Sequence, residues 1–222
     1  MSSKKKITRY SKTKKQQIKN TKPIIIHIEG VQGSGKSYIC SKIASSNVKC
    51  IDIDDVDLEI KNYIDSLVGT SKEMPRNMDS LGIVWKTKLD DIIEHETKLG
   101  KKIIVIVGVK RIYMKDTALD NASYKFFIKL DDLKKIYRRV FIRETDKILE
   151  NGNKIKEIIN NSKIDEDEIG DMVNRITNLA LPYPVEYDQY ENNYKRELDR
   201  ATKAKYEIMS QEAIIKKINS LK

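Results

Sequence analysis

The glycine-rich stretch at residues 30–37, Gly-Val-Gln-Gly-Ser-Gly-Lys-Ser, has the residue types and spacing that most clearly suggest chemistry. It follows the apolar run Ile24 to Ile28 and fits the pattern G-x-x-x-x-G-K-[S/T] between a strand and a helix. Glycines let such a loop turn its backbone N–H groups inward and let an anion approach closely. The helix that follows adds the partial positive charge of its N-terminus. The pattern therefore predicts a loop that holds a polyphosphate.

Two side chains of this loop would complete a nucleotide site. Lys36 would reach the β- and γ-phosphates, and the Ser37 hydroxyl would ligate Mg²⁺. ATP and Mg²⁺ are therefore the expected cofactors. The residues expected to contact the nucleotide are Gly30, Val31, Gln32, Gly33, Ser34, Gly35, Lys36, Ser37 and Tyr38.

Acidic residues end the second apolar run of the chain, within residues 50–57. The period of two in a strand would place Asp52 and Asp54 on one side, next to the phosphate loop of a parallel sheet. Neighbouring carboxylates repel each other unless a cation or an acceptor hydroxyl lies nearby. We expect Asp52 to ligate Mg²⁺ and Asp54 to orient the acceptor hydroxyl. The alternative, which we favour for Asp55 and Asp57, is that these acids cap the next helix.

Arginines occur at three positions where an anionic substrate would need a cation. Arg139 and Arg143 lie four residues apart, on one flank of a helix predicted to begin at Asp131. Their planar guanidinium groups suit the neutralisation of a transferred phosphoryl group, although a solvated flank that pairs with nearby acids is the alternative. Arg111 follows the third apolar run and would grip an anionic group of the acceptor.

Short apolar runs alternate with longer amphipathic stretches from residue 23 onward. This alternation predicts parallel strands with right-handed crossovers, hence an α/β fold with three α/β/α layers, a mostly parallel sheet and C-terminal helices. No fifth strand is evident beyond a faint candidate at residues 185–187. The expected strands are 24–28, 48–53, 103–107 and 125–130, and the expected helices are 37–45, 56–67, 79–99, one from 131 and one at 193–220.

The glycine-rich loop in this setting resembles the P-loop NTPase superfamily. The third run ends at Gly108 without an acid, unlike helicase, ABC or AAA+ ATPases, and no Asn-Lys-x-Asp guanine reader follows. Asp-x-Asp after the second strand resembles the nucleoside, nucleotide and shikimate kinase-like group. That resemblance implies metal and acceptor roles for Asp52 and Asp54, a substrate-binding role for Arg76, and a lid at about residues 138–165.

The resemblance implies a P-loop kinase, a phosphotransferase that moves the γ-phosphoryl group of ATP to a small acceptor. The triple glycine of shikimate kinases and the Asp-Gly-x-Pro-Arg stretch of adenylate kinases are both missing, so the acceptor stays open, with a nucleoside or nucleotide favoured. One alternative is a polynucleotide 5′-kinase. The other is a non-catalytic ATP-binding module whose charged terminal helix recruits a partner.

The net charge of +10 comes largely from one end of the chain. Residues 1–22 hold nine of the 43 basic residues and no acid, which leaves 34 basic against 33 acidic residues elsewhere. We therefore expect a basic, disordered arm at 1–22 and a kinase-like domain at 23–222. The arm is a candidate contact for nucleic acid or a nuclear import signal, and a solvated leader is the alternative.

The apolar runs, the start of the sequence and the cysteines predict the cellular location. The longest apolar runs fall far short of the ~20 residues needed to cross a bilayer, and no signal-peptide pattern begins the sequence. We expect a cytoplasmic protein without a membrane partner, or a nuclear one through the arm. Cys40 and Cys50 lack metal-type spacing, and a reduced compartment fits them better than a disulfide. We expect both to be unpaired and to pack as small buried hydrophobic residues. Nothing in the sequence predicts the oligomeric state.

Overall fold

The computed structural model describes residues 22–66, 77–140 and 187–222, together with residues 142, 143, 146, 150 and 153. The predicted basic arm, the predicted lid and Arg76 lie wholly or largely outside these residues. The elements are β1 (Ile24–Glu29), α1 (Lys36–Ile43), β2 (Val48–Asp52), α2 (Ile53–Ser66), α3 (Met78–Lys98), β3 (Ile103–Val107), β4 (Tyr124–Ile128), α6 (Tyr187–Lys203), β5 (Glu207–Met209) and α7 (Gln211–Asn219). Residues 133–140 are also helical.

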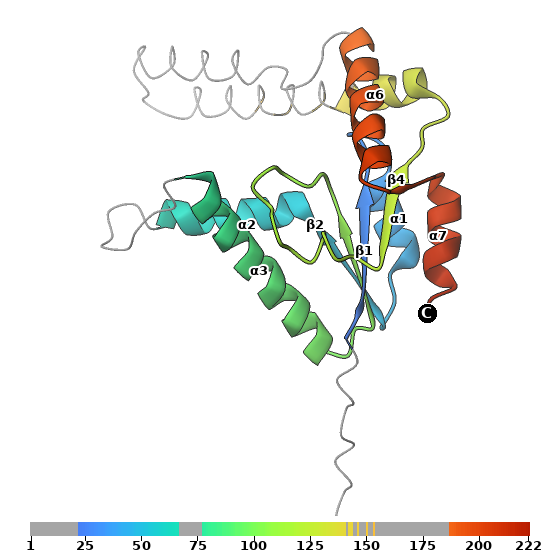
Figure 1. Ribbon diagram of the computed structural model, residues 1–222. Helices are drawn as coiled ribbons and strands as arrows, with labels where there is room; N and C mark the ends of the chain where they lie inside the picture. Colours follow the sequence, from blue (N-terminus) through green and yellow to red (C-terminus); the bar gives the residue numbers. More distant parts are fainter. Residues whose placement is uncertain are drawn as a thin grey trace, which may run out of the picture.

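The described strands form one five-stranded sheet in the order β2-β3-β1-β4-β5, and every strand pair in it is parallel. Helices α2 and α3 cover one face, whereas α1 and α7 cover the other (Figure 1). Parallel strands need such crossovers, which bury both faces of the sheet. The predicted α/β fold with three layers and a parallel sheet is therefore confirmed.

Two hydrophobic cores lie on the two faces of the sheet, because successive side chains of a strand point in opposite directions. Ile26 and Ile28 pack with α1 and α7, whereas Ile104 and Ile106 pack with α2 and α3. Trp85 of α3 is fully buried in the second core. These apolar runs hold the carboxyl ends of β1, β2 and β3 side by side, which positions the site described below.

Helix α6 brings a third cluster of buried side chains onto the sheet. Tyr190 and Tyr194 are buried together with Phe127 of β4 and Val31 of the loop after β1. The Tyr194 hydroxyl accepts a hydrogen bond from the Leu130 N–H at 3.1 Å. Tyr190 and Tyr194 therefore attach the helix to the core.

The C-terminal segment differs from the single helix predicted at 193–220. Helix α6 ends at Lys203, and Lys205 adopts a φ of +60°, which turns the chain out of the helix. Strand β5 then pairs in parallel with β4, and α7 follows. The fifth strand therefore exists, and the prediction missed it because three residues are too few to show a period of two.

The two cysteines were expected to be unpaired, and this prediction is wrong. Cys40 of α1 and Cys50 of β2 form a disulfide, with their Cα atoms 5.8 Å apart. Both are partly buried against the same hydrophobic core, so the packing of α1 on the sheet brings together residues ten apart in sequence. Among the described residues, no helix is long and apolar enough to cross a membrane.

Candidate functional site

The glycine-rich loop connects β1 to α1, as its pattern predicts. Residues 31–34 form a turn closed by a hydrogen bond from the Ser34 N–H to the Val31 carbonyl, at 3.1 Å. Gly33, the third residue of this turn, has a φ of +75°, as a type II turn requires. Gly35 has a φ of +90° at the start of α1. Both positions therefore need glycine for the backbone alone.

The space behind the loop is also too small for a side chain at either of these glycines. A Cβ atom at Gly33 would collide with Val140, and one at Gly35 would collide with Gln211. The helical residues 133–140 and α7 therefore pack directly on the loop. This packing holds the loop in place and leaves its other side open.

A cavity of about 670 Å³ opens at the carboxyl ends of β1, β2 and β3. In parallel α/β sheets this is the edge at which ligands bind. Ten of the predicted site residues line it together. They are Gly30, Gln32, Gly33, Gly35, Lys36, Ser37, Asp52, Asp54, Arg111 and Arg143, and Gly108 and Val109 complete the lining.

Four predicted residues do not line this cavity. Val31 and Ser34 are buried beneath the loop, and Tyr38 is about half exposed with Lys42 over its ring. Arg139 is exposed on the helical residues 133–140. Loop residues are contiguous in sequence but alternate in direction, so only part of the expected set can face an anion.

Lys36 lies against the loop that it would help to close. Its Nζ donates hydrogen bonds to the carbonyl oxygens of Gly30, at 2.8 Å, and Val31, at 3.2 Å. Burial lowers the pKa of Lys36, while the negative charges of Asp52 and Asp54 oppose this shift. A cation that has lost its water is stabilised by an anion, so the position suits a phosphate group.

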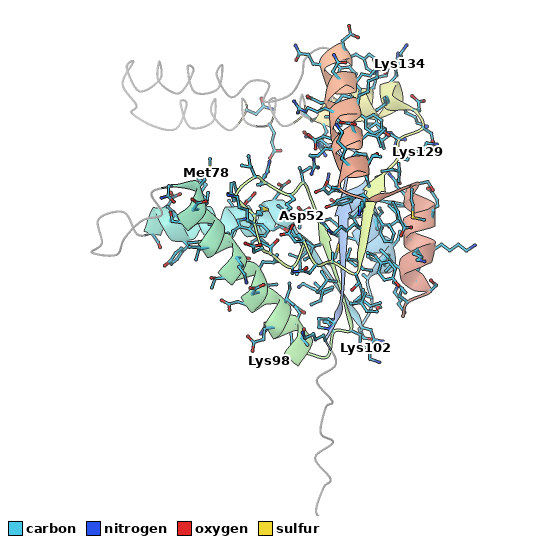
Figure 2. All side chains as sticks on the ribbon, in the orientation of Figure 1. Asp52, Met78, Lys98, Lys102, Lys129 and Lys134 are labelled. Atoms are coloured by element: carbon cyan, nitrogen blue, oxygen red, sulfur yellow. A yellow bond between two sulfur atoms is a disulfide. The ribbon has the colours of Figure 1, made fainter. Side chains whose placement is uncertain are left out.

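Asp52 is the last residue of β2, close to the middle of the molecule (Figure 2). Its Oδ1 accepts a hydrogen bond at 3.0 Å from the Asp54 N–H, in the first turn of α2. Asp54 therefore lies in a helix, and the predicted placement of both acids on one strand is wrong. Helix α2 begins directly after the strand and not at residue 56, so Asp52 is the residue that caps it. Burial raises the pKa of Asp52, and the charges of Asp54 and Asp55 add to this.

Arg111 joins the acidic side of the cavity to the third strand. Its guanidinium group lies 3.3 Å from Asp54 and 3.6 Å from Asp57. Asp57 also accepts hydrogen bonds from the Trp85 Nε1, at 2.6 Å, and the Tyr113 hydroxyl, at 3.3 Å. Asp57 therefore anchors side chains instead of capping α2, which corrects the sequence-based interpretation. These contacts hold Arg111 at the rim of the cavity.

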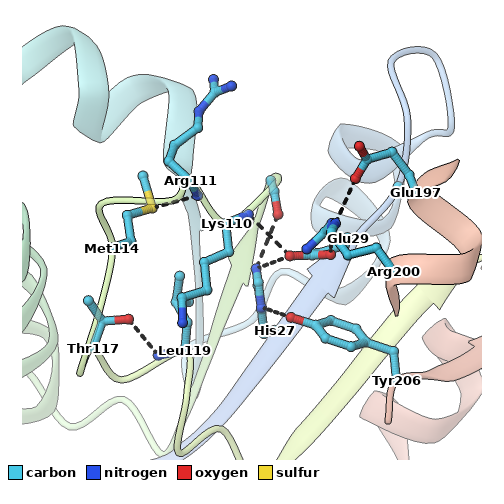
Figure 3. A network of polar contacts seen from close by, with 12 residues as sticks. His27, Glu29, Lys110, Arg111, Met114, Thr117, Leu119, Glu197, Arg200 and Tyr206 are labelled. Carbon is cyan, nitrogen blue, oxygen red and sulfur yellow. Dashed lines mark hydrogen bonds and ion pairs between the residues drawn. The ribbon is translucent and has the colours of Figure 1, made fainter. Parts of the chain in front are cut away.

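A second polar group, here called the buried cluster, lies behind the loop and consists of His27, Glu29, Arg200 and Tyr206 (Figure 3). Glu29 is fully buried, binds the Arg200 Nη2 at 2.5 Å and accepts from the Lys110 N–H at 3.1 Å. No sequence pattern predicted this cluster, because its β1 and C-terminal members lie far apart in the chain. An acid at the end of an otherwise apolar strand was its only local signal.

His27 is a neutral part of the buried cluster. Its Nε2 donates to the Gly108 carbonyl at 3.1 Å, since a carbonyl oxygen can only accept. Its Nδ1 therefore accepts from the Tyr206 hydroxyl at 2.7 Å. Burial lowers the pKa of His27 from 6.5 to about 4, although the charge of Glu29 opposes the shift. His27 is therefore a packed, hydrogen-bonded histidine of the core.

The residues of the cavity fit Mg-ATP. Ser37 and Asp52 offer a hydroxyl and a carboxylate oxygen beside Lys36, and Mg²⁺ favours one or two such protein ligands plus water and phosphate oxygens. Among the described residues, no group of three or more His, Cys, Asp or Glu side chains could hold a metal by itself.

A parallel α/β sheet with a glycine-rich loop between its first strand and first helix is the P-loop NTPase fold. No family model and no curated protein match the sequence. The chain is similar in structure to shikimate kinase from Bacteroides thetaiotaomicron, at 14% identity and a TM-score of 0.40 over 89% of this chain and 97% of that one.

Two further solved structures are similar to this chain. TT1252 from Thermus thermophilus shares 16% identity at a TM-score of 0.36, over 79% of this chain and 86% of that one. APE1195 shares 15% identity at a TM-score of 0.34, over 77% and 96% respectively. The strand order of the sheet and the glycine-rich loop between β1 and α1 define the fold.

Proposed function

We propose that the protein is an ATP-dependent phosphotransferase that moves the γ-phosphoryl group of ATP to a small acceptor, a nucleoside or nucleotide. One observation carries this proposal: a single cavity brings together the loop, Lys36, Ser37, two carboxylates and Arg111. Positioning and charge neutralisation supply most of the rate in phosphoryl transfer, and these groups offer both.

The loop side of the cavity would bind ATP. The backbone N–H groups of the loop and the Lys36 ammonium would hold the β- and γ-phosphates, with the N-terminus of α1 beneath them. Ser37 and Asp52 would hold Mg²⁺, which would neutralise charge on the transferred group when bound. The raised pKa of Asp52 supports this role, because a carboxylate crowded by like charge gains most from a cation.

The acidic side would bind the acceptor. Asp54 lies at the cavity, where its carboxylate would accept a hydrogen bond from the acceptor hydroxyl and take up its proton. Arg111 would bind an anionic group of the acceptor, and Arg143 would face the transferred phosphoryl group. For Arg139 the corresponding role stays a prediction.

A second cavity of about 210 Å³ supports room for an acceptor. It shares Gln32, Val109 and Arg111 with the first cavity and extends toward α6, where Asn193 and Arg196 line it. The two cavities therefore lie next to each other around Arg111. An acceptor with a polar or anionic end would find both hydrogen-bond donors and positive charge there.

A screen of acceptors with Mg-ATP, measured by ADP release, tests the proposed function. Nucleosides, nucleotides and oligonucleotides with a 5′-hydroxyl are compared, each with the full chain and with a chain lacking residues 1–22. Release that depends on a mononucleoside or nucleotide is expected. Release only with oligonucleotides, weakened and less salt-dependent without the arm, would favour the polynucleotide kinase. ATP binding without release for any acceptor would favour the non-catalytic module.

A further inference from the structure

Two side chains from the C-terminal part of the chain reach the phosphate loop from outside the large cavity. The Tyr190 hydroxyl of α6 donates a hydrogen bond at 2.9 Å to the Gln32 carbonyl oxygen. The Gln211 Nε2, at the start of α7, donates at 2.5 Å to the Ser34 carbonyl oxygen. Neither side chain lines the large cavity, although Tyr190 lines the smaller one beside it.

The planar peptide bond converts these contacts into a direction for the next N–H group. In a trans peptide the C=O and the following N–H point in opposite directions, and the described residues contain no cis peptide bond. The Gly33 N–H therefore points away from Tyr190, and the Gly35 N–H points away from Gln211. Gly33 and Gly35 both line the large cavity, which neither donor lines.

We propose that Tyr190 and Gln211 are positioning residues that hold two peptide units of the loop with their N–H groups turned toward the phosphates. This inference rests on the proposed binding of a nucleotide in the cavity. It adds that α6 and α7, as well as the glycines of the loop, set the direction of the N–H groups that would bind the phosphates. These N–H groups are here called the anion cradle.

Glycine makes such support necessary. Gly33 and Gly35 have φ values of +75° and +90°, and glycine passes between backbone regions with little steric cost. Rotation of either peptide by half a turn would present a carbonyl oxygen to the phosphates where a donor had been. A hydrogen bond to that carbonyl on the outer side opposes the rotation.

Both donors are themselves held firmly. Tyr190 is 1% exposed, and its ring lies 5.7 Å from the ring of Tyr137. Gln211 is the first residue of α7, whose N-terminus is capped by the Ser210 side chain. A donor fixed by packing loses little side-chain freedom when it makes its bond, so each contact favours one orientation of the loop.

Substitutions that remove only the hydrogen-bond donor, with matched controls, test this inference. Tyr190→Phe removes only the hydroxyl, and Gln211→Met keeps the length of the side chain but removes the donor. The controls are Tyr194→Phe, whose hydroxyl bonds Leu130 on the same face of α6, and Glu212→Met at an exposed neighbouring position. Calorimetry measures the affinity of each full-length protein for Mg-ATP and for inorganic tripolyphosphate, and urea unfolding measures stability.

Each of the two test variants is expected to bind both ligands roughly tenfold more weakly than the wild type, as the loss of one orienting hydrogen bond predicts. Tyr194→Phe and Glu212→Met are expected to bind as the wild type does. The loss should be equal for ATP and tripolyphosphate, because the cradle contacts phosphate and not the base. A loss confined to ATP, or equal losses in the controls, would overturn the inference.

Amide NMR gives a readout that a purely structural role would not change. In the wild type, tripolyphosphate is expected to move the Gly33 and Gly35 amide proton signals downfield, and the matching variant should reduce the shift of its own glycine. Unchanged shifts would contradict the inference alone. A wild-type protein that binds neither ligand would instead reject the proposed function, and the inference with it.

Discussion

The buried cluster and the acids of the cavity lie only one or two strands apart, yet their negative charges are stabilised to different degrees. In the buried cluster Glu29 is fully enclosed and is matched by Arg200 and a backbone N–H. At the cavity, the Asp52 carboxylate accepts one hydrogen bond from the Asp54 backbone N–H, and burial raises the pKa of Asp52, with the charges of Asp54 and Asp55 adding to the shift.

This difference separates a structural role from a functional one. Charges that are matched inside the protein contribute to holding β1, β3 and α6 together, and nothing remains for a ligand to neutralise. At the cavity the guanidinium group of Arg111 pairs with Asp54, whereas the carboxylate of Asp52 is destabilised by burial and by the charges of Asp54 and Asp55. A bound cation would stabilise Asp52, which is typical of functional sites. Substitutions in the buried cluster should therefore change stability, and substitutions at the cavity should change turnover.

The largest expected effect is that of Lys36→Ala on turnover. Removal of the cation that contacts the transferred phosphoryl should lower ADP release by about 1,000-fold or more. The free energy of unfolding should stay within about 1 kcal/mol of wild type, because a desolvated cation contributes little to folding. ADP release measures the effect on turnover, and urea unfolding measures the effect on stability. Lys42→Ala, an exposed lysine of the same helix, is the control, and turnover within tenfold of wild type would reject the role of Lys36.

Arg200→Met should destabilise the protein by roughly 3 kcal/mol, because Glu29 would be left as a buried charge without its partner. Urea unfolding measures the change. The double variant with Glu29→Gln should recover part of the loss, since it removes the unpaired charge. Lys203→Met, an exposed position on the same helix, should stay near wild type. A loss no greater than that of Lys203→Met would show that the pair does not stabilise the fold.

His27 should make stability depend on pH. Because its folded pKa of about 4 lies below the ordinary 6.5, the unfolded chain takes up the proton first. Stability should therefore be complete above pH 6.5 and fall by about 3 kcal/mol as the pH drops toward 4. Glu29, Lys125, Arg200 and Tyr206 set the electrostatic surroundings of the ring in the folded state.

Urea unfolding between pH 4 and 7.5 measures this dependence. His27→Gln should flatten the curve, whereas His95→Gln, at the exposed second histidine, should leave its shape unchanged. Equal curves for the two variants would mean that His27 is not the source of the dependence.

Asp52→Asn should give the smallest change in stability, with the sign opposite to that of Arg200→Met. Asparagine can still accept the Asp54 N–H and cap α2, but it removes the repulsion. The protein without nucleotide should be as stable as wild type or up to about 1 kcal/mol more stable, since the carboxylate is only half-buried and water screens it. Thermal unfolding without nucleotide measures this effect.

The gain from Asp52→Asn should grow as the pH rises from about 4, the ordinary pKa of an aspartate, through the raised pKa of Asp52 in the folded protein, because only the wild type has a carboxylate there to ionise. A folded pKa that is raised means that ionisation costs stability, so the wild type loses free energy across that window. Turnover with Mg-ATP should nevertheless fall, by about 100-fold, whereas Asp55→Asn should preserve it. A less stable Asp52→Asn protein would show that the carboxylate is structural.

The phosphate loop and the order of the first elements could be predicted because their signals are local. Glycine spacing, a cation and a hydroxyl between an apolar run and a helix need no distant partner to be recognised. The continuous apolar runs of β1 and β3 likewise predicted a sheet buried on both faces. The acids could be assigned to the site, but the helix that begins directly after Asp52 could not, since its first turn looks like the end of a strand.

Tertiary structure alone decided what surrounds the loop. Tyr190 and Gln211 bind the loop, and Arg200 and Tyr206 bind Glu29 and His27 of β1. These residues lie more than 150 positions after the loop in sequence and reach it and β1 only because β5 pairs with β4 and α6 and α7 pack on the sheet. A strand of three residues has no periodicity of its own, and its partner defines it. The sequence by itself therefore determined which atoms could bind a phosphate, and the fold decided their direction, because burial and pairing depend on residues distant in the chain.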